Sequence, residues 1–316
     1  GLRAGALRGG AVRARGRRMR ARRWPAPTAL AVALVVAVLA GACDTPPSVA
    51  PTPSAPPQPT ATTTTYPLDT TVWYAGLVLT FGSATAVLDP RGGPVTIQLQ
   101  LQNPGASDQP FDTPVELLVA GTSYEPARDS VLPSVPAGGT AQATLKFNVF
   151  GVRSADAAVI QIGAPGQHLG VVPFSAGNVG PVVLKPVSFG LSGSTTASDL
   201  RLVASGGLLR WDLPDWAEEL PAGSAALVLT YAVTYTGTFS GGVPFTGDNI
   251  RLALPDGRVE EPRADGRSQS ISAILPGQTL KGLFSRFEIP AGLGGTYALV
   301  LVENGKQGKV TFKLPG

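Results

Sequence analysis

The chain has 316 residues, including 39 glycines, 30 prolines, one histidine and one cysteine. This length accommodates about two domains, and the glycine and proline content favours a turn-rich β protein over a helical one. Nine of the 25 Lys and Arg residues lie in residues 1–23. From residue 43 onward, 16 basic residues face 21 acidic ones, a net charge of −5, so the high isoelectric point is no evidence for nucleic-acid binding.

The N-terminal part has the three regions of a secretory signal peptide. Residues 1–23 are rich in arginine, residues 28–42 are uncharged and apolar, and the small residues Gly41 and Ala42 end the run. The apolar run from residue 29 to 42 has 14 residues, whereas a transmembrane helix, the alternative interpretation, needs about 20. We therefore predict a signal peptide over residues 1–42, with the true start at Met19 and an upstream misreading before it.

The only cysteine follows this run directly. The segment Leu39-Ala40-Gly41-Ala42-Cys43 is typical of a bacterial lipobox, in which the cysteine receives acyl chains and becomes the first residue of the mature protein. We predict lipidation of Cys43 and a location at the cell membrane on the extracytoplasmic side, either the cell surface or the periplasm. With this cysteine modified, no disulfide is available within the chain, so packed apolar surface has to stabilise the fold.

Residues 44–67 contain eight prolines and the run Thr62-Thr63-Thr64-Thr65. They have few bulky apolar side chains, so they bury too little surface to fold. We predict a disordered Pro/Thr-rich linker over residues 43–67, extended by its prolines, with order beginning near Thr70.

The following residues predict antiparallel β-strands. Several short segments are rich in β-branched and aromatic residues, some with strict alternation of apolar and polar side chains, and Gly/Pro turns separate them. The clearest are residues 72–74, 77–81, 95–101 and 144–149. Strands at this spacing, with no long helical periodicity, predict a β-sandwich over residues 68–180.

The second half repeats the first. Six features recur in the same order at offsets that drift between 132 and 140 residues, which indicates a duplicated domain over residues 181–316. The pairs are Ile97–Gly105 with Leu229–Gly237, Pro110-Phe111 with Pro244-Phe245, Val119–Thr122 with Leu254–Val259, Val135-Pro136 with Leu275-Pro276, Ala158–Ile162 with Ala298–Val302, and Phe174 with Phe312.

These repeated segments resemble a known family. A strand ending in Asn-Pro-Gly or Thr-Gly, then a hairpin, then Leu/Val-Pro before a strand closing on Phe is similar to the immunoglobulin-like domain of bacterial lipoproteins and secreted antigens, the immunoprotective extracellular antigen-like domain. The resemblance implies two tandem immunoglobulin-like sandwiches, extracytoplasmic display and a binding or structural role, with no catalytic residues to transfer. The second half departs from the pattern by an insert at residues 204–224.

Residues suited to catalysis or metal binding are few. His168 lies beside a Pro-Gly turn without a nucleophile motif, so we interpret it as a surface histidine rather than part of a triad or a metal site. We expect the carboxylate pairs Glu218-Glu219 and Glu260-Glu261 to point to solvent. Asp256-Gly257 and Asp265-Gly266 lack the spacing of a calcium loop and are interpreted as turns. We predict no enzyme activity, no metal and no cofactor.

The insert is the one candidate binding surface. Arg210, Trp211 and Trp216 have the composition of an interface hot spot, and exposed Trp rings also stack on sugars. Pro214 suits the first position of a short helix, with Pro221 beyond its end. The interpretation we favour is that the insert folds over an open end of the sandwich and buries both rings.

The sequence therefore predicts a membrane-anchored lipoprotein that acts as a protein-binding or structural module of the cell envelope. One alternative is a carbohydrate-recognition module that uses Trp211, Trp216 and Trp73. Another is an accessory subunit of an envelope complex. The expected partners are the membrane, through the lipid anchor, and an envelope protein or a glycan, but no nucleic acid.

Overall fold

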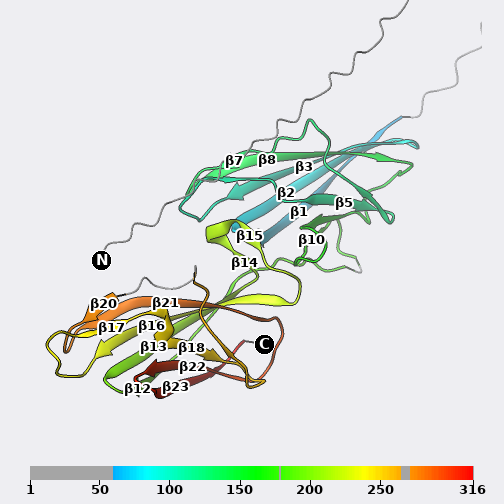
Figure 1. The fold of residues 1–316 in the computed structure, drawn as a ribbon. Helices are drawn as coiled ribbons and strands as arrows, with labels where there is room; N and C mark the ends of the chain where they lie inside the picture. The colour runs from blue at the N-terminus through cyan, green and yellow to red at the C-terminus, as the bar shows by residue number, and fades with distance from the viewer. Residues whose placement is uncertain (1–59, 178, 265–270, 316) are drawn as a thin grey trace, which may run out of the picture. The chain divides into compact units, whose positions relative to one another are not determined.

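The computed structural model describes residues 60–177, 179–264 and 271–315 (Figure 1). Cys43, its signal segment and most of the linker lie outside these residues. The described chain is all-β, as predicted, with antiparallel pairing throughout and two single turns of 3-10 helix. Within it, no helix has the length and apolar character needed to cross a membrane.

The first half forms two four-stranded sheets with the strand orders β1-β2-β3-β8 and β10-β9-β5-β6, and a small β4-β7 pair (Figure 1). In β3, alternate residues such as Ile97 and Leu99 are buried, which is the pattern of a strand with one face on a core. The strands are β1 (Thr62–Tyr74), β2 (Leu77–Leu88), β3 (Gly92–Gln102), β4 (Gln109–Pro110), β5 (Val115–Val119), β6 (Thr122–Tyr124), β7 (Ser134–Val135), β8 (Thr140–Phe150), β9 (Val159–Ile162) and β10 (Gly170–Pro173).

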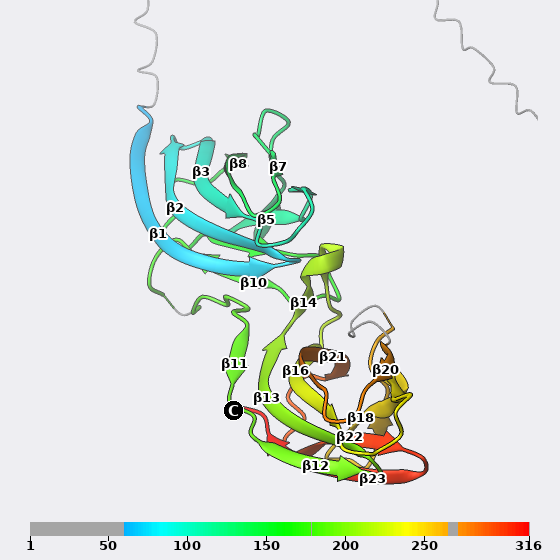
Figure 2. The ribbon, with the colours of Figure 1, turned by 90° about the vertical axis from the view of Figure 1, so that its left-hand side faces the viewer.

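The second half has the sheets β11-β13-β16-β21, in which β12 also pairs with β13, and β19-β18-β22-β23, with a β17-β20 pair (Figure 2). Strands β14 and β15 form a separate two-stranded hairpin that is not hydrogen-bonded into either sheet. The elements are β11 (Val187–Phe189), β12 (Gly193–Ala197), β13 (Leu200–Arg210), β14 (Asp212–Leu213), η1 (Pro214–Trp216), β15 (Glu218–Glu219), β16 (Ser224–Tyr235), β17 (Val243–Phe245), η2 (Gly247–Asn249), β18 (Ile250–Ala253), β19 (Val259–Glu260), β20 (Ile271–Ile274), β21 (Thr279–Pro290), β22 (Thr296–Glu303) and β23 (Lys306–Lys313).

Each half has its own apolar core between its two sheets. Buried side chains from Tyr66 to Phe174 form one continuous cluster, and those from Leu191 to Phe312 form another. Both clusters draw residues from both of the larger sheets in their half, which is the arrangement of a β-sandwich.

The strand orders of the two halves correspond. The series β2-β3-β8 matches β13-β16-β21, and β10-β9-β5-β6 matches β23-β22-β18-β19. The six sequence matches fall on equivalent elements, for example the β5–β6 and β18–β19 hairpins and the pairs β4-β7 and β17-β20. The halves differ at the first strand, where β11 and β12 together take the place of the long β1.

The predicted linker extends too far toward the C-terminus. Strand β1 begins at Thr62, and Thr62–Thr65 pair with residues 85–88 of β2. Threonine is β-branched and suits a strand, so the Thr run belongs to the sheet rather than to a disordered segment. Pro67 is tolerated because β1 is an edge strand and its pairing register shifts after this residue. The sandwich therefore begins before residue 68.

Tyr66 tests this correction, because a linker residue would not contribute to stability. Its side chain is buried, its ring lies 5.2 Å from that of Phe174, and its hydroxyl donates a 2.8 Å hydrogen bond to Asp156. We expect Tyr66→Ala to lower the free energy of unfolding by about 3–4 kcal/mol in chemical denaturation. Thr64→Ala, at an exposed position of the same strand, should change it by no more than ~0.5 kcal/mol. Equal effects of the two substitutions would contradict the assignment.

Candidate functional site

The predicted insert forms a compact hairpin at residues 210–220, which we call the junction hairpin. It consists of β14, the 3-10 turn η1 and β15, with Pro214 in the first turn as predicted. The short helix is a single turn, and Ala217 ends it in the left-handed conformation with φ 53°. Leu213 and Leu220 pack with Ala226 in a small apolar cluster of their own, which fixes the base of the hairpin.

Two buried carboxylates of the junction hairpin bind the β1–β2 turn of the first half. Asp212 and Glu219 are directly opposite in the β14-β15 register, and each is 3% exposed. Asp212 Oδ2 accepts from the Gly76 amide at 2.7 Å, and Glu219 Oε2 accepts from the Ala75 amide at 2.9 Å. Arg210 completes the arrangement with a bidentate pair to Asp212 at 2.6 and 3.1 Å. We call these two carboxylate contacts the clasp.

Both central residues of the turn that the clasp holds have positive φ. Ala75 and Gly76 have φ of 47° and 86°, as a two-residue hairpin with the favoured handedness requires. The Ala75 carbonyl accepts a 2.7 Å hydrogen bond from Gln109 Nε2. A Cβ on residue 76 would lie 2.8 Å from Pro214 Cα, so only glycine permits this approach of the hairpin.

The two carboxylates at residues 218 and 219 do not both point to solvent, contrary to our expectation. Glu218 is exposed, whereas Glu219 is buried and its Oε1 atom has no hydrogen-bond partner among the described residues. Burial raises the pKa of Glu219 to about 8, with a further contribution from the charge of Asp212, while the Ala75 amide and Arg210 oppose the shift. Period-2 alternation explains the difference, because adjacent residues of β15 face opposite sides.

His168 is also more than a surface turn residue. Its Nε2 lies 2.6 Å from the Ser224 carbonyl oxygen, and it is partly buried. The preceding residue, Gln167, accepts a 2.8 Å hydrogen bond from the Tyr74 hydroxyl, and Ala222 donates to the Gly166 carbonyl at 2.8 Å. The loop at residues 164–168 therefore lies against residues 220–224, and His168 has a structural partner rather than a catalytic one.

The three candidate binding residues have different environments. The Arg210 guanidinium is held by Asp212, and its side chain is only 16% exposed. Trp211 is partly buried and packs against the core of the second half. Trp216 is 42% exposed, which corrects the expectation that both rings are buried. Trp73, the other sugar-binding candidate, lies under Lys185, with the ammonium 5.6 Å from the ring centroid.

Trp216 is exposed but firmly placed. The Arg286 guanidinium of β21 lies 5.2 Å from its ring centroid and donates a 2.8 Å hydrogen bond to Asp215. Two cavities adjoin the ring: one of about 310 Å³ against residues 103–110, and one of about 360 Å³ against residues 112–114, Gln167 and β15. Neither is lined by Trp211 or Trp73, so the three tryptophans do not form one platform.

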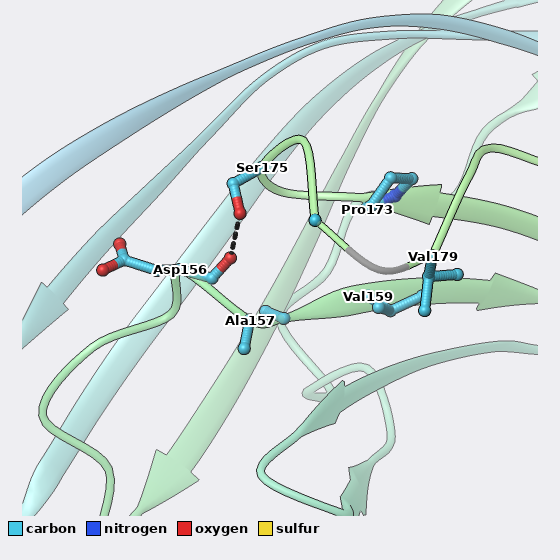
Figure 3. A pocket seen from close by; sticks show the side chains of 8 residues that line it. Asp156, Ala157, Val159, Pro173, Ser175 and Val179 are labelled. Carbon is cyan, nitrogen blue, oxygen red and sulfur yellow. Dashed lines mark hydrogen bonds between the residues drawn. The ribbon is translucent and has the colours of Figure 1, made fainter.

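A third cavity, of about 370 Å³, lies in the first half between the ends of β9 and β10 (Figure 3). Val159 and Val179 both line it, and the Ser175 hydroxyl donates a 2.5 Å hydrogen bond to the Asp156 carbonyl, which Figure 3 marks. The Asp156 carboxylate accepts from Tyr66. Because these polar groups are paired within the protein, the cavity is a weaker candidate than the surface around Trp216.

The remaining acidic candidates have structural contacts. Asp256 holds Arg258 in the β18–β19 turn, and Glu260 and Glu261 lie 3.5 and 3.0 Å from Arg258 and Arg251. Asp265-Gly266 lies outside the described residues. Among the described side chains, no group of three or more His, Cys, Asp or Glu is arranged to hold a metal ion.

The sequence did not identify the clasp or Arg286. Asp212 and Glu219 are separated by six residues around Pro214, which is compatible with a tight hairpin, but nothing in the sequence pairs them with Ala75 and Gly76, more than 130 residues away. The β1–β2 turn does have a sequence signal, because a small residue and a glycine separate two runs of strand-forming residues.

No family model matches the chain, and no curated protein does. Among solved structures, the chain is similar to a conserved domain protein from Bacillus anthracis, with 9% sequence identity over 79% of this chain and 90% of that one and a TM-score of 0.24. A likeness of this degree carries no argument about function.

The raised pKa of Glu219 predicts a pH-dependent stability. The folded pKa of about 8 lies above the ordinary value of 4.5, so the fold binds this proton more tightly than the unfolded chain. The protonated Glu219 therefore contributes to the free energy of unfolding. This contribution is fully present below pH ~4.5 and is lost as the pH rises to ~8, a change on the order of a few kcal/mol. Glu219→Gln, which retains an acceptor for the Ala75 amide, should remove this part of the pH dependence of urea unfolding.

Glu218→Gln is the matched control, because this neighbouring carboxylate is exposed. It should leave the pH profile of the wild-type protein unchanged. A profile that is the same in the Glu219→Gln variant as in the wild type would show that Glu219 does not titrate in this range.

The close approach of Gly76 to Pro214 predicts that a side chain at residue 76 destabilises the fold. Gly76 and Gly121 have similar φ values of 86° and 80°, but an added Cβ at Gly121 meets nothing within 4 Å. Both alanine substitutions carry the same backbone strain, so the clash with Pro214 should make Gly76→Ala more destabilising by about 1–3 kcal/mol. Equal losses in denaturant titrations would argue against close packing of the hairpin on the turn.

Proposed function

We propose that this protein is a lipid-anchored, extracytoplasmic lipoprotein whose two immunoglobulin-like sandwiches act as a protein-binding module of the cell envelope. The lipobox at residues 39–43 and the signal segment before it support the anchor and the location. Two antiparallel sandwich cores support the display role, because strands form a rigid frame on which loops and inserts present side chains.

The observation that carries the binding role is the environment of Trp216. A tryptophan that is 42% exposed and yet fixed by Arg286 and Asp215 is ready to bind without ordering itself first. Trp and Arg are the side chains most enriched at interface hot spots. The flanking cavities give a partner side chain a place to enter beside the ring.

A glycan is the second candidate ligand. It is favoured by the exposed Trp216 ring, which borders a cavity with Gln167 and carboxylates, the side chains that hydrogen-bond sugar hydroxyls. The separation of Trp216 from Trp211 and Trp73 weighs against the extended sugar platform that the sequence suggested, and makes a protein partner the stronger candidate.

Photo-crosslinking in intact cells tests the proposal. A photoreactive residue replaces Ala217, which is exposed next to Trp216 and adjoins both cavities. We expect the full-length protein in the membrane fraction, with acyl chains on Cys43 by mass spectrometry, and one discrete crosslinked protein that is lost on adding Trp216→Ala.

Two controls accompany this experiment. The same photoreactive residue at Phe239, which is 67% exposed in another loop, should not yield that product. Cys43→Ser should release the protein from membranes. An unmodified thiol at position 43 would exclude the anchor, and identical crosslinking from positions 217 and 239 would exclude Trp216 as the binding surface.

A further inference from the structure

The cavity between Trp216 and Glu219 is lined by three carboxylates and no basic side chain. Asp112, Glu218 and Glu219 border it, and its volume is about 360 Å³. Asp112 and Glu218 are exposed, whereas Glu219 is buried. An acidic recess of this kind disfavours anions and lowers the energy of a cation that enters it.

Glu219, which borders this cavity, is a buried carboxyl group that is only partly hydrogen-bonded. Glu219 is 3% exposed, and its Oε1 atom has no hydrogen-bond partner among the described residues. A buried carboxyl oxygen without a partner costs free energy in the empty protein. Arg210, whose charge lowers the pKa of Glu219, is already bound to both oxygens of Asp212 and does not compensate Glu219 fully.

Aromatic rings complete the chemistry of this recess. Trp216 and Tyr74 both line it, and the Trp face is the aromatic surface that binds cations best. One cation, the Arg286 guanidinium, already lies against the Trp216 ring. The structure therefore contains an example of the contact that a bound cation would make with the same side chain.

We propose that this cavity binds an organic cation, namely the ammonium or guanidinium group of a basic side chain on the partner protein. The inference rests on the proposed binding role and gives the chemistry of the partner. Asp112 and Glu218 supply the outer contacts, Glu219 supplies a buried carboxyl group, and Trp216 supplies the aromatic wall. A neutral sugar would desolvate the two exposed carboxylates, Asp112 and Glu218, without neutralising them, which makes it the less favoured occupant.

Cation binding is coupled to proton release. In the empty site, burial holds the pKa of Glu219 at about 8, so the group is largely protonated at neutral pH. The other ionisable groups around it are Asp212, Arg210 and Tyr74, together with Glu218 and Asp112 across the cavity. A cation favours the ionised form of Glu219, so its binding expels a proton and strengthens as the pH rises from 6 to 9.

The test uses the mature protein and short blocked peptides. Acetyl-Gly-Lys-Gly-amide and its arginine analogue are titrated against the indole N–H signals of the protein in NMR spectra, with the Trp216 signal identified by its loss in Trp216→Ala. We expect both peptides to shift this signal, and the Nε-acetylated lysine peptide, which is neutral, to leave it unchanged. Glu219→Gln and Glu218→Gln should each weaken binding by about tenfold or more.

Matched controls separate charge at the cavity from charge in general. Glu125 is exposed in the first half and does not line the cavity, so Glu125→Gln should not change the affinity. Wild-type affinity should increase with pH, and the Glu219→Gln affinity should not. Because Glu218 is exposed, its variant keeps the test decisive even where Glu219→Gln alters the fold.

Several results would overturn the proposal. These are equal binding of the acetylated peptide, wild-type affinity in both glutamine variants, absence of any shift with the basic peptides, or a shift with N-acetylglucosamine oligomers instead. Tighter binding of spermidine than of the peptides would assign the cavity to a free amine and overturn the protein partner. Membrane fractionation and crosslinking from position 217 report on the proposed function separately, so the two failures are distinguishable.

Discussion

The organisation of this protein depends on two carboxylates that accept the backbone amides of one hairpin turn. Asp212 and Glu219 come from the second half of the chain, and Ala75 and Gly76 from the first. Both amides belong to left-handed residues of a tight turn, so the strand ladder does not use them. These two hydrogen bonds join the two halves at 2.7 and 2.9 Å. The one to Asp212, which also pairs with Arg210, is of the stronger, charge-assisted kind.

The clasp is costly as well as strong. Burying two carboxyl groups side by side is unfavourable, and only Asp212 receives an arginine. Burial raises the pKa of Glu219 to about 8, and its Oε1 atom has no hydrogen-bond partner in the part of the chain that the structure describes. Apolar side chains would join two sandwiches at a lower free-energy cost. In natural proteins, such unfavourable local arrangements are concentrated at functional positions. The same hairpin also presents the exposed Trp216, which lines one cavity together with Glu219.

Local sequence patterns predicted much of the fold. The alternation in residues 95–101 and 144–149 predicted strands with one buried face, and β3 and β8 have that burial. The internal repeat predicted a duplicated domain, since paired turns and core residues recur at a nearly constant offset, and the two halves have corresponding strand orders. The prediction was wrong at Thr62–Thr65, because composition suggested a linker where pairing with β2 makes a strand. The partners of an edge strand lie elsewhere in the chain, so composition alone does not reveal them.

The all-β class, the duplicated pattern and a short helical turn beginning at Pro214 could be predicted from the sequence, because each follows from periodicity, turn residues or repeated spacing within a short window. Long-range packing places Trp211 against a core while Trp216 remains exposed, and it buries Glu219 rather than Glu218. These outcomes depend on contacts with Ala75, Gln167 and Arg286, which lie tens of residues away or more. A side chain's solvent exposure and its proton affinity are set by the neighbours that folding brings to it, and these neighbours are not encoded in its own segment.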